Sequence, residues 1–85
     1  MKLAFEPEAW HQFLHWQETD KAVFRRLTGL LKQCQRHPFE GTGKPEPLRG
    51  DLAGWWSRRI THEHRLVYRG KDDMLEILAC RFHYF

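Results

Sequence analysis

The sequence predicts an α+β fold, in which two N-terminal helices pack on one face of a small twisted antiparallel β-sheet. Three observations predict it. Apolar side chains recur at helical spacing over residues 7–36. Three apolar, β-prone runs fill residues 55–82 and are separated by short polar connections. The length of 85 residues suits a single domain, 1–85, with a small core.

A short strand and a first helix are expected at the start of the chain. Residues 2–5 are mostly apolar and predict the strand. Pro7 lies between two glutamates, and both proline and acidic side chains favour the first turn of a helix. One face of this helix is expected to consist of Trp10, Phe13, Leu14 and Gln17.

A second helix is expected after Thr19 and Asp20, which can cap its first turn. The apolar face of this helix is Val23, Leu27, Leu30, Leu31 and Cys34. The helix is expected to end at His37, because the residue before a proline avoids the helical conformation.

The middle of the chain predicts a loop. Residues 39–48 hold two glycines and two prolines, which disfavour regular structure. A long polar loop in so small a domain points to a functional role. A turn or an edge strand is expected between Gly50 and Gly54.

The last third predicts an antiparallel meander with strands at 55–61, 64–69 and 74–82 and a turn at 70–73. In strict alternation, Leu78, Cys80 and Phe82 face the helices, whereas Ile77 and Ala79 face away from them.

The same alternation sorts the charged residues of the sheet. A cationic group is expected on the face opposite the helices, consisting of Arg59, Arg65, Arg81 and His83. Trp55 is expected on that face too, available for base stacking or dimer packing. Arg58 is expected on the helix side, where it must reach an edge or a partner.

Composition excludes several classes of protein. No run of apolar residues is long enough for a membrane-spanning helix, and the first residues lack the apolar core of a signal peptide. Two cysteines, Cys34 and Cys80, are too few for a disulfide scaffold; they are expected in the core of a reduced, cytoplasmic protein. The net charge of +3 permits a polyanionic partner without requiring one.

An acid–base pair beside arginines suits cleavage of RNA by its own 2′-hydroxyl. His83 has a side chain whose ordinary pKa permits proton transfer at neutral pH, and Glu46 supplies a base. Arginines, with Lys44 and Arg49 on the neighbouring loop, can bind the phosphate. This route needs no metal or cofactor. Neither the pair His11 and His15 nor the pair His62 and His64 has further ligands at zinc spacing.

Several strings of the sequence resemble the YoeB family of bacterial toxins, within the RelE-like mRNA interferases. They are WQETDK at 16–21, PFEG at 38–41, GKPEPL at 43–48, WSRRIT at 56–61, EHRLVY at 63–68, ACR at 79–81 and HY at 83–84. The resemblance extends over essentially the whole chain. It implies a RelE-like, microbial-RNase-like fold and a toxin that cuts mRNA in the ribosomal A site. It also implies a homodimer and a YefM-type antitoxin, whose complex with the toxin binds operator DNA.

The resemblance also implies roles for individual residues. Glu46 stands at the position of the general base and His83 at that of the general acid. Arg65 matches the arginine that stabilises the transition state, and Arg59 a second phosphate-binding arginine. Tyr84 matches a substrate-orienting aromatic residue. Arg49 replaces a lysine that relatives often carry, and Phe85 makes the chain one residue longer than the family pattern.

Simpler interpretations stand beside these. Arg59 and Arg65 are alternatively ion-pair partners of Glu63, Asp51 or Glu76, and Arg81 suits a surface ion pair as well as the open face. In function, the alternatives are a non-catalytic module that binds RNA or the ribosome, and a corepressor that acts with its antitoxin on operator DNA.

Overall fold

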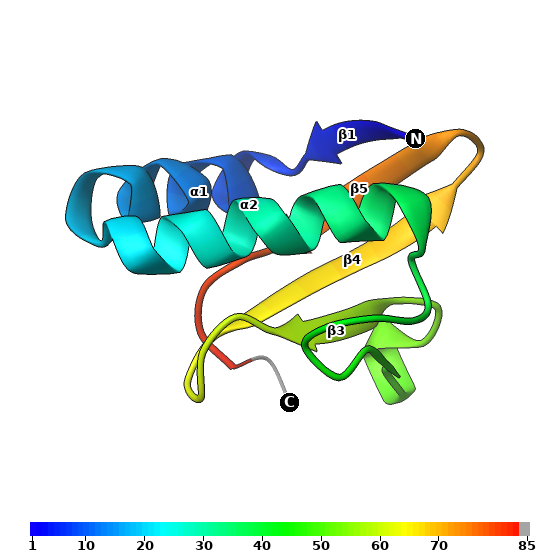
Figure 1. Cartoon of the computed structure of the whole chain (residues 1–85). Coiled ribbons are helices and arrows are strands. Elements are labelled where there is room, and N and C mark those ends of the chain that lie inside the picture. Colours follow the sequence, from blue (N-terminus) through cyan, green and yellow to red (C-terminus); the bar gives the residue numbers. More distant parts are fainter. Residues whose placement is uncertain (84–85) are drawn as a thin grey trace.

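The structure, a computed structural model of the chain, describes residues 1–83 and confirms the predicted fold class. Two helices lie side by side over one face of a five-stranded sheet (Figure 1). The elements in chain order are β1 (Lys2–Phe5), α1 (Pro7–Thr19), α2 (Lys21–Arg36), β2 (Glu46–Pro47), a 3-10 helix (Gly50–Leu52), β3 (Trp56–Arg59), β4 (Arg65–Lys71) and β5 (Met74–Ala79).

The sheet has the strand order β1-β5-β4-β3-β2. The predicted meander of β3, β4 and β5 is antiparallel, and β2 extends it at one edge. At the other edge β1 pairs with β5 in parallel, so the sheet as a whole is mixed. This pairing joins the two ends of the chain, and no local pattern in the sequence specifies it.

Both helix starts follow the predicted capping chemistry. Pro7 occupies the first turn of α1. The Asp20 carboxylate accepts a hydrogen bond of 3.1 Å from the backbone N–H of Val23, which satisfies one of the unpaired donors at the start of α2. The helix ends at Arg36, with His37 as its C-cap just before Pro38.

The core lies between the two helices and the sheet. The predicted face of α2 is correct, since Leu27, Leu30, Leu31 and Cys34 are buried and Val23 packs against them. Cys34 and Cys80 are both buried and unpaired, as predicted. Among residues 1–83, no helix is long and apolar enough to cross a membrane.

The predicted face of α1 is wrong in part. Its buried residues are Ala9, Gln12 and Trp16, whereas Gln17 is exposed. Gln12 is drawn inward because its amide oxygen accepts the backbone N–H of Cys80 at 2.8 Å. Trp10 is 46% exposed and stacks on Phe13, outside the main core.

The predicted faces of β5 are wrong in part because the strand contains a β-bulge. Val67 pairs with Ala79, but the next residue, Tyr68, pairs with Ile77, so Leu78 is an extra residue in β5. Paired residues share a face of the sheet, so Ile77 faces the helices and Ala79 faces away. The prediction that Ile77 lies on the open face was therefore wrong, because strict alternation takes no account of a bulge.

The connecting segment also departs from the prediction of an irregular loop. Glu46 and Pro47 form the short strand β2 at the sheet edge, and the expected turn after Gly50 is a 3-10 helix. The segment between α2 and β2 crosses the helix side of β3 before it reaches that edge (Figure 1).

Candidate functional site

Strand register brings Glu46, Arg59 and Arg65 to one end of the sheet, on the face away from the helices. Glu46 of β2 lies opposite Ser57 of β3, and Arg59 is two residues further along the same face. Arg59 in turn lies opposite Arg65 of β4. We refer to these three residues, Glu46, Arg59 and Arg65, as the Glu–Arg–Arg cluster.

The side chain of Arg65 is held by the turn between β3 and β4. Its Nη1 donates to the carbonyl oxygens of Thr61, His62 and His64 at 3.0, 3.1 and 3.3 Å. The residue is only 8% exposed. A guanidinium anchored through one nitrogen keeps a fixed orientation, which suits recognition of a phosphate.

The cluster carries an excess of positive charge. Burial lowers the pKa of Arg65, the Arg59 guanidinium lowers it further, and the Glu46 carboxylate raises it. Among residues 1–83 the ion pairs are Arg69 with Glu76 and His37 with Glu40, and neither includes Arg59 or Arg65. The expected alternative, in which these two arginines serve in structural ion pairs, is thus not what the described part of the chain shows. One carboxylate beside two guanidinium groups leaves positive charge for an anionic ligand.

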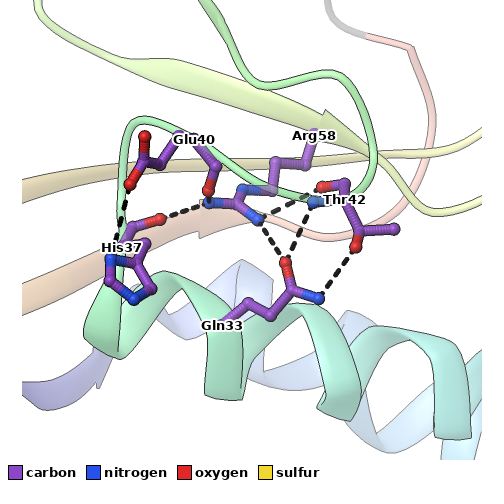
Figure 2. A network of polar contacts seen from close by, with 5 residues as sticks. All are labelled: Gln33, His37, Glu40, Thr42 and Arg58. Atoms are coloured by element: carbon purple, nitrogen blue, oxygen red, sulfur yellow. Dashed lines mark hydrogen bonds and ion pairs between the residues drawn. The ribbon is translucent and has the colours of Figure 1, made fainter.

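Arg58, the neighbour of Arg59 in β3, organises the segment that leads to Glu46. Its side chain is fully buried on the helix side, as the alternation predicted. Its guanidinium donates five hydrogen bonds, to the carbonyl oxygens of His37, Glu40 and Thr42, to the Gln33 amide oxygen and to the Tyr68 hydroxyl. Figure 2 shows the loop carbonyls converging on this one side chain. The partner that Arg58 was expected to need is therefore this loop.

Gln33 of α2 completes the network. Its amide oxygen accepts from Arg58 and from the backbone N–H of Thr42, and its amide nitrogen donates to the Thr42 hydroxyl at 2.8 Å (Figure 2). The next residue, Gly43, has a φ of +86° and its carbonyl accepts the Arg59 N–H at 2.7 Å. The loop is thus bonded to the side chain of Arg58 and to the backbone of Arg59 just before Glu46.

The C-terminal segment reaches the cluster through its backbone. The carbonyl of Phe82 accepts the backbone N–H of Arg65 at 3.0 Å, so His83 follows directly after a residue paired with the cluster. His83 is exposed. Tyr84 and Phe85 lie outside the described residues.

Three other predicted residues take different positions. Lys44 and Arg49 are exposed and flank Glu46 along the chain, and within residues 1–83 no hydrogen bond or ion pair joins either side chain to the cluster. Arg81 does not lie with Arg59 and Arg65 on the open face. Its guanidinium lies over the rings of Trp16 and Phe82, at 5.7 and 4.6 Å, because Arg81 lies beyond the end of β5, in a segment bonded to α1 through Cys80.

Two contributors were not foreseen from the sequence. Arg58 was placed correctly, but its role was not; a charged residue at a core-facing strand position was the available signal. His64 was considered only as a metal ligand, yet its Nδ1 accepts the backbone N–H of Phe82 at 2.8 Å. In residues 1–83, no group of three or more histidine, cysteine or acidic side chains could hold a metal ion.

Trp55, on the open face, contacts another residue of the same chain: the Arg69 guanidinium lies over its ring, 4.4 Å from the ring centre. This cation–π contact accounts for an aromatic side chain outside the core.

Comparisons with known proteins show the family of the chain. The model of the YoeB-like toxin of bacterial type II toxin-antitoxin systems matches residues 5–84. Toxin YoeB of Escherichia coli (strain K12) is 57% identical over 84 residues, which is 99% of this chain and 100% of the relative.

Solved structures agree. A YoeB/ParE toxin from Agrobacterium tumefaciens has a TM-score of 0.94 at 50% identity, over 99% of this chain and 100% of the other. A YoeB dimer and a YoeB-YefM complex, both from Staphylococcus aureus, have TM-scores of 0.92 and 0.91 at 41% and 40% identity. Each covers 99% of this chain and 98% of the other.

Proposed function

Because the chain belongs to the YoeB-like toxin family of bacterial type II toxin–antitoxin systems, we propose that it is a ribosome-dependent endoribonuclease that cuts mRNA in the ribosomal A site. The observation that carries the proposal is the Glu–Arg–Arg cluster, in which the Glu46 carboxylate and the Arg59 guanidinium both lie within electrostatic range of Arg65, on a helix-free face. A base beside a phosphate-binding pair is the minimum that cleavage by the RNA 2′-hydroxyl requires.

In the proposed reaction Glu46 takes the proton of the 2′-hydroxyl. The 2′-oxygen then attacks the adjacent phosphorus, and the bond from phosphorus to the 5′-oxygen breaks. His83 gives its proton to the departing 5′-oxygen. The products are a 2′,3′-cyclic phosphate and a 5′-hydroxyl. Arg65 and Arg59 stabilise the negative charge that develops on the phosphoryl oxygens.

The remaining site residues act on binding. We propose that Lys44 and Arg49 contact the RNA backbone on either side of Glu46, since both are exposed cations flanking it. Tyr84, next to His83 in sequence, would orient the substrate by stacking.

Structures of relatives support the proposed protein partners. The Staphylococcus aureus YoeB has been solved as a dimer and in complex with YefM. We propose a homodimer for this chain as well, a YefM-like antitoxin that neutralises it, and operator DNA as a ligand of the toxin–antitoxin complex alone. Action on ribosomes would place the protein in the cytoplasm.

A reconstituted translation reaction on a defined mRNA tests the function. Wild type, Glu46→Gln and the control Asp51→Asn are compared with and without ribosomes, and the new 5′ ends and 3′ phosphates are mapped. We expect wild type and the control to cut at the A-site codon only with ribosomes, and Glu46→Gln to cut about 100-fold more slowly or worse. Ribosome or RNA binding by folded wild type without any cleavage would reject the enzyme and favour a binding module.

A further inference from the structure

Phe82 is held at both of its backbone polar groups. Its N–H donates to the Nδ1 of His64 at 2.8 Å, and its carbonyl accepts the backbone N–H of Arg65 at 3.0 Å. Both partners belong to the junction between the β3–β4 turn and β4. The two bonds therefore tie the last described segment of the chain to the strand that carries Arg65.

The conformation of Phe82 needs this support. Its φ of +69° lies in the left-handed region, which bulky residues rarely adopt without compensating contacts. Two residues earlier, Cys80 is fixed to α1, since its N–H donates to Gln12 and its carbonyl accepts the Trp16 indole N–H at 2.8 Å each. The segment 80–82 is thus bonded at both ends, and His83 is the next residue.

His64 can accept this bond only while its ring is neutral. An imidazole that accepts at Nδ1 carries its proton on Nε2, and a protonated ring has no acceptor left. The ring lies between Trp16, at 4.8 Å between ring centres, and Phe82, at 6.1 Å. Burial lowers the pKa of His64; Glu63 raises it, and Arg81, His15 and Arg65 lower it. Those four charged or titratable side chains and the two rings surround it.

We propose that neutral His64 is the positioning residue for His83: by accepting the Phe82 N–H, it fixes the backbone that leads directly into the proposed general acid, next to the strand that carries Arg65. The proposal rests on the proposed function, because it assigns His64 a purpose in the same reaction. It gives the two histidines opposite requirements. In the proposed reaction His64 must be unprotonated while His83 carries a proton. Protonation of His64 should therefore lower the activity at acidic pH.

Three variants separate acceptor, bulk and titration. His64→Leu introduces a side chain of similar size that has no hydrogen-bond acceptor. His64→Asn places an oxygen acceptor near the position of Nδ1 and does not titrate. His11→Asn, at an exposed position of α1 outside the site, is the matched control. Amide hydrogen exchange at Phe82 is measured by NMR, and kcat and KM by cleavage on programmed ribosomes from pH 5 to 8.

We expect His64→Leu to lower kcat about 100-fold with KM nearly unchanged, since a misplaced catalytic group affects the chemical step rather than binding. Exchange at Phe82 should accelerate in the same variant. His64→Asn should restore both the protection of Phe82 and most of kcat, and its activity should persist to lower pH than that of wild type. The control should match wild type throughout.

Wild-type kcat and wild-type protection of Phe82 in folded His64→Leu would overturn the proposal. If His64→Leu does not fold, the wild type still decides, because protection of Phe82 must fall as the His64 ring titrates; unchanged protection through that titration overturns it. Absence of cleavage by wild type at every pH would instead reject the proposed function, and the exchange data would then report on His64 independently.

Discussion

Arg59 and Arg65 lie directly opposite each other across β3 and β4, as Cα partners in the strand register. Like charges at directly opposed positions of a sheet are destabilising, by roughly 0.2–1 kcal/mol. Within the described residues neither side chain has an acidic ion-pair partner to offset this, and the nearby Glu46 is one carboxylate for two guanidinium groups. Such an arrangement suits an anionic ligand, which would supply the missing negative charge.

Arg59→Gln should accordingly raise the stability of the free protein while impairing its function. The substitution removes the repulsion from Arg65 but also removes the proposed phosphate contact. We expect a slightly higher unfolding midpoint at low salt, and a gain that shrinks as salt screens the charges. Thermal unfolding at two ionic strengths measures the first effect, and cleavage kinetics the second. An unfolding midpoint lower than that of wild type would contradict this view of the cluster.

At the adjacent residue, Arg58→Met should instead lower the stability of the free protein. Arg58 is fully buried and donates to five acceptors, so methionine leaves loop carbonyls of His37, Glu40 and Thr42 without their donor. Each acceptor that stays buried without its donor costs about 1–3 kcal/mol of the free energy of unfolding. Urea unfolding measures the change in free energy, and hydrogen exchange over residues 37–46 shows whether the loop is released. The same loss in Arg59→Gln would show that the effect is not specific to the buried side.

Local patterns were sufficient for most elements of the fold. Caps, helical periodicity and strand propensity located both helices and the meander, because each depends on residues close together in sequence. What they missed depends on distant contacts. The bulge at Leu78 reverses the predicted face of Ile77, and the hydrogen bond from Cys80 to Gln12 places the buried face of α1 away from its most apolar side.

In the candidate site, too, the sequence predicted what nearby residues determine and missed what distant contacts determine. Alternation within β3 and β4 correctly placed Arg59 and Arg65 together, and the register of β2 adds Glu46. Alternation failed for Arg81, since the chain beyond β5 is governed by contacts with α1 rather than by a strand. The roles of Arg58 and His64 depend on backbone groups of remote segments, which residue types alone do not reveal.

Glycine substitutions test whether the loop before Glu46 needs its conformation. Gly43 has a φ of +86°, and an added Cβ would lie 3.1 Å from the Arg59 carbonyl oxygen and 3.2 Å from Leu30. We expect Gly43→Ala to destabilise the protein by about 1–3 kcal/mol. Gly29→Ala in α2, where an added Cβ meets nothing within 4 Å, should instead stabilise it by about 0.5–1 kcal/mol. Urea unfolding compares the two; equal effects would show that the loop tolerates a side chain at Gly43.

Folding stability should fall as the pH decreases below about 6.5, the ordinary pKa of histidine. Because the pKa of His64 is lowered in the folded protein, the unfolded chain binds more protons in this range, and stability rises with pH. The contribution is present above pH 6.5 and is lost as the pH falls below it. His64→Asn cannot titrate there, so the free energy of unfolding should depend less on pH than in wild type. Identical pH dependence in the two proteins would remove His64 from this effect.

A 2′-deoxy substitution in the mRNA tests whether the 2′-hydroxyl is the nucleophile. If Glu46 activates the 2′-hydroxyl next to the broken bond, an mRNA with a single 2′-deoxy nucleotide at that position should resist cleavage. This mRNA should still assemble with ribosomes as the unmodified mRNA does. The same substitution one codon upstream is the matched control and should leave the rate unchanged, since its hydroxyl takes no part in the reaction. Cleavage of the modified bond would mean that water or another group attacks the phosphorus, and Glu46 would then have to activate that nucleophile. The 3′ end decides between the routes, because only attack by the 2′-oxygen yields a 2′,3′-cyclic phosphate, whereas direct hydrolysis leaves an open phosphate.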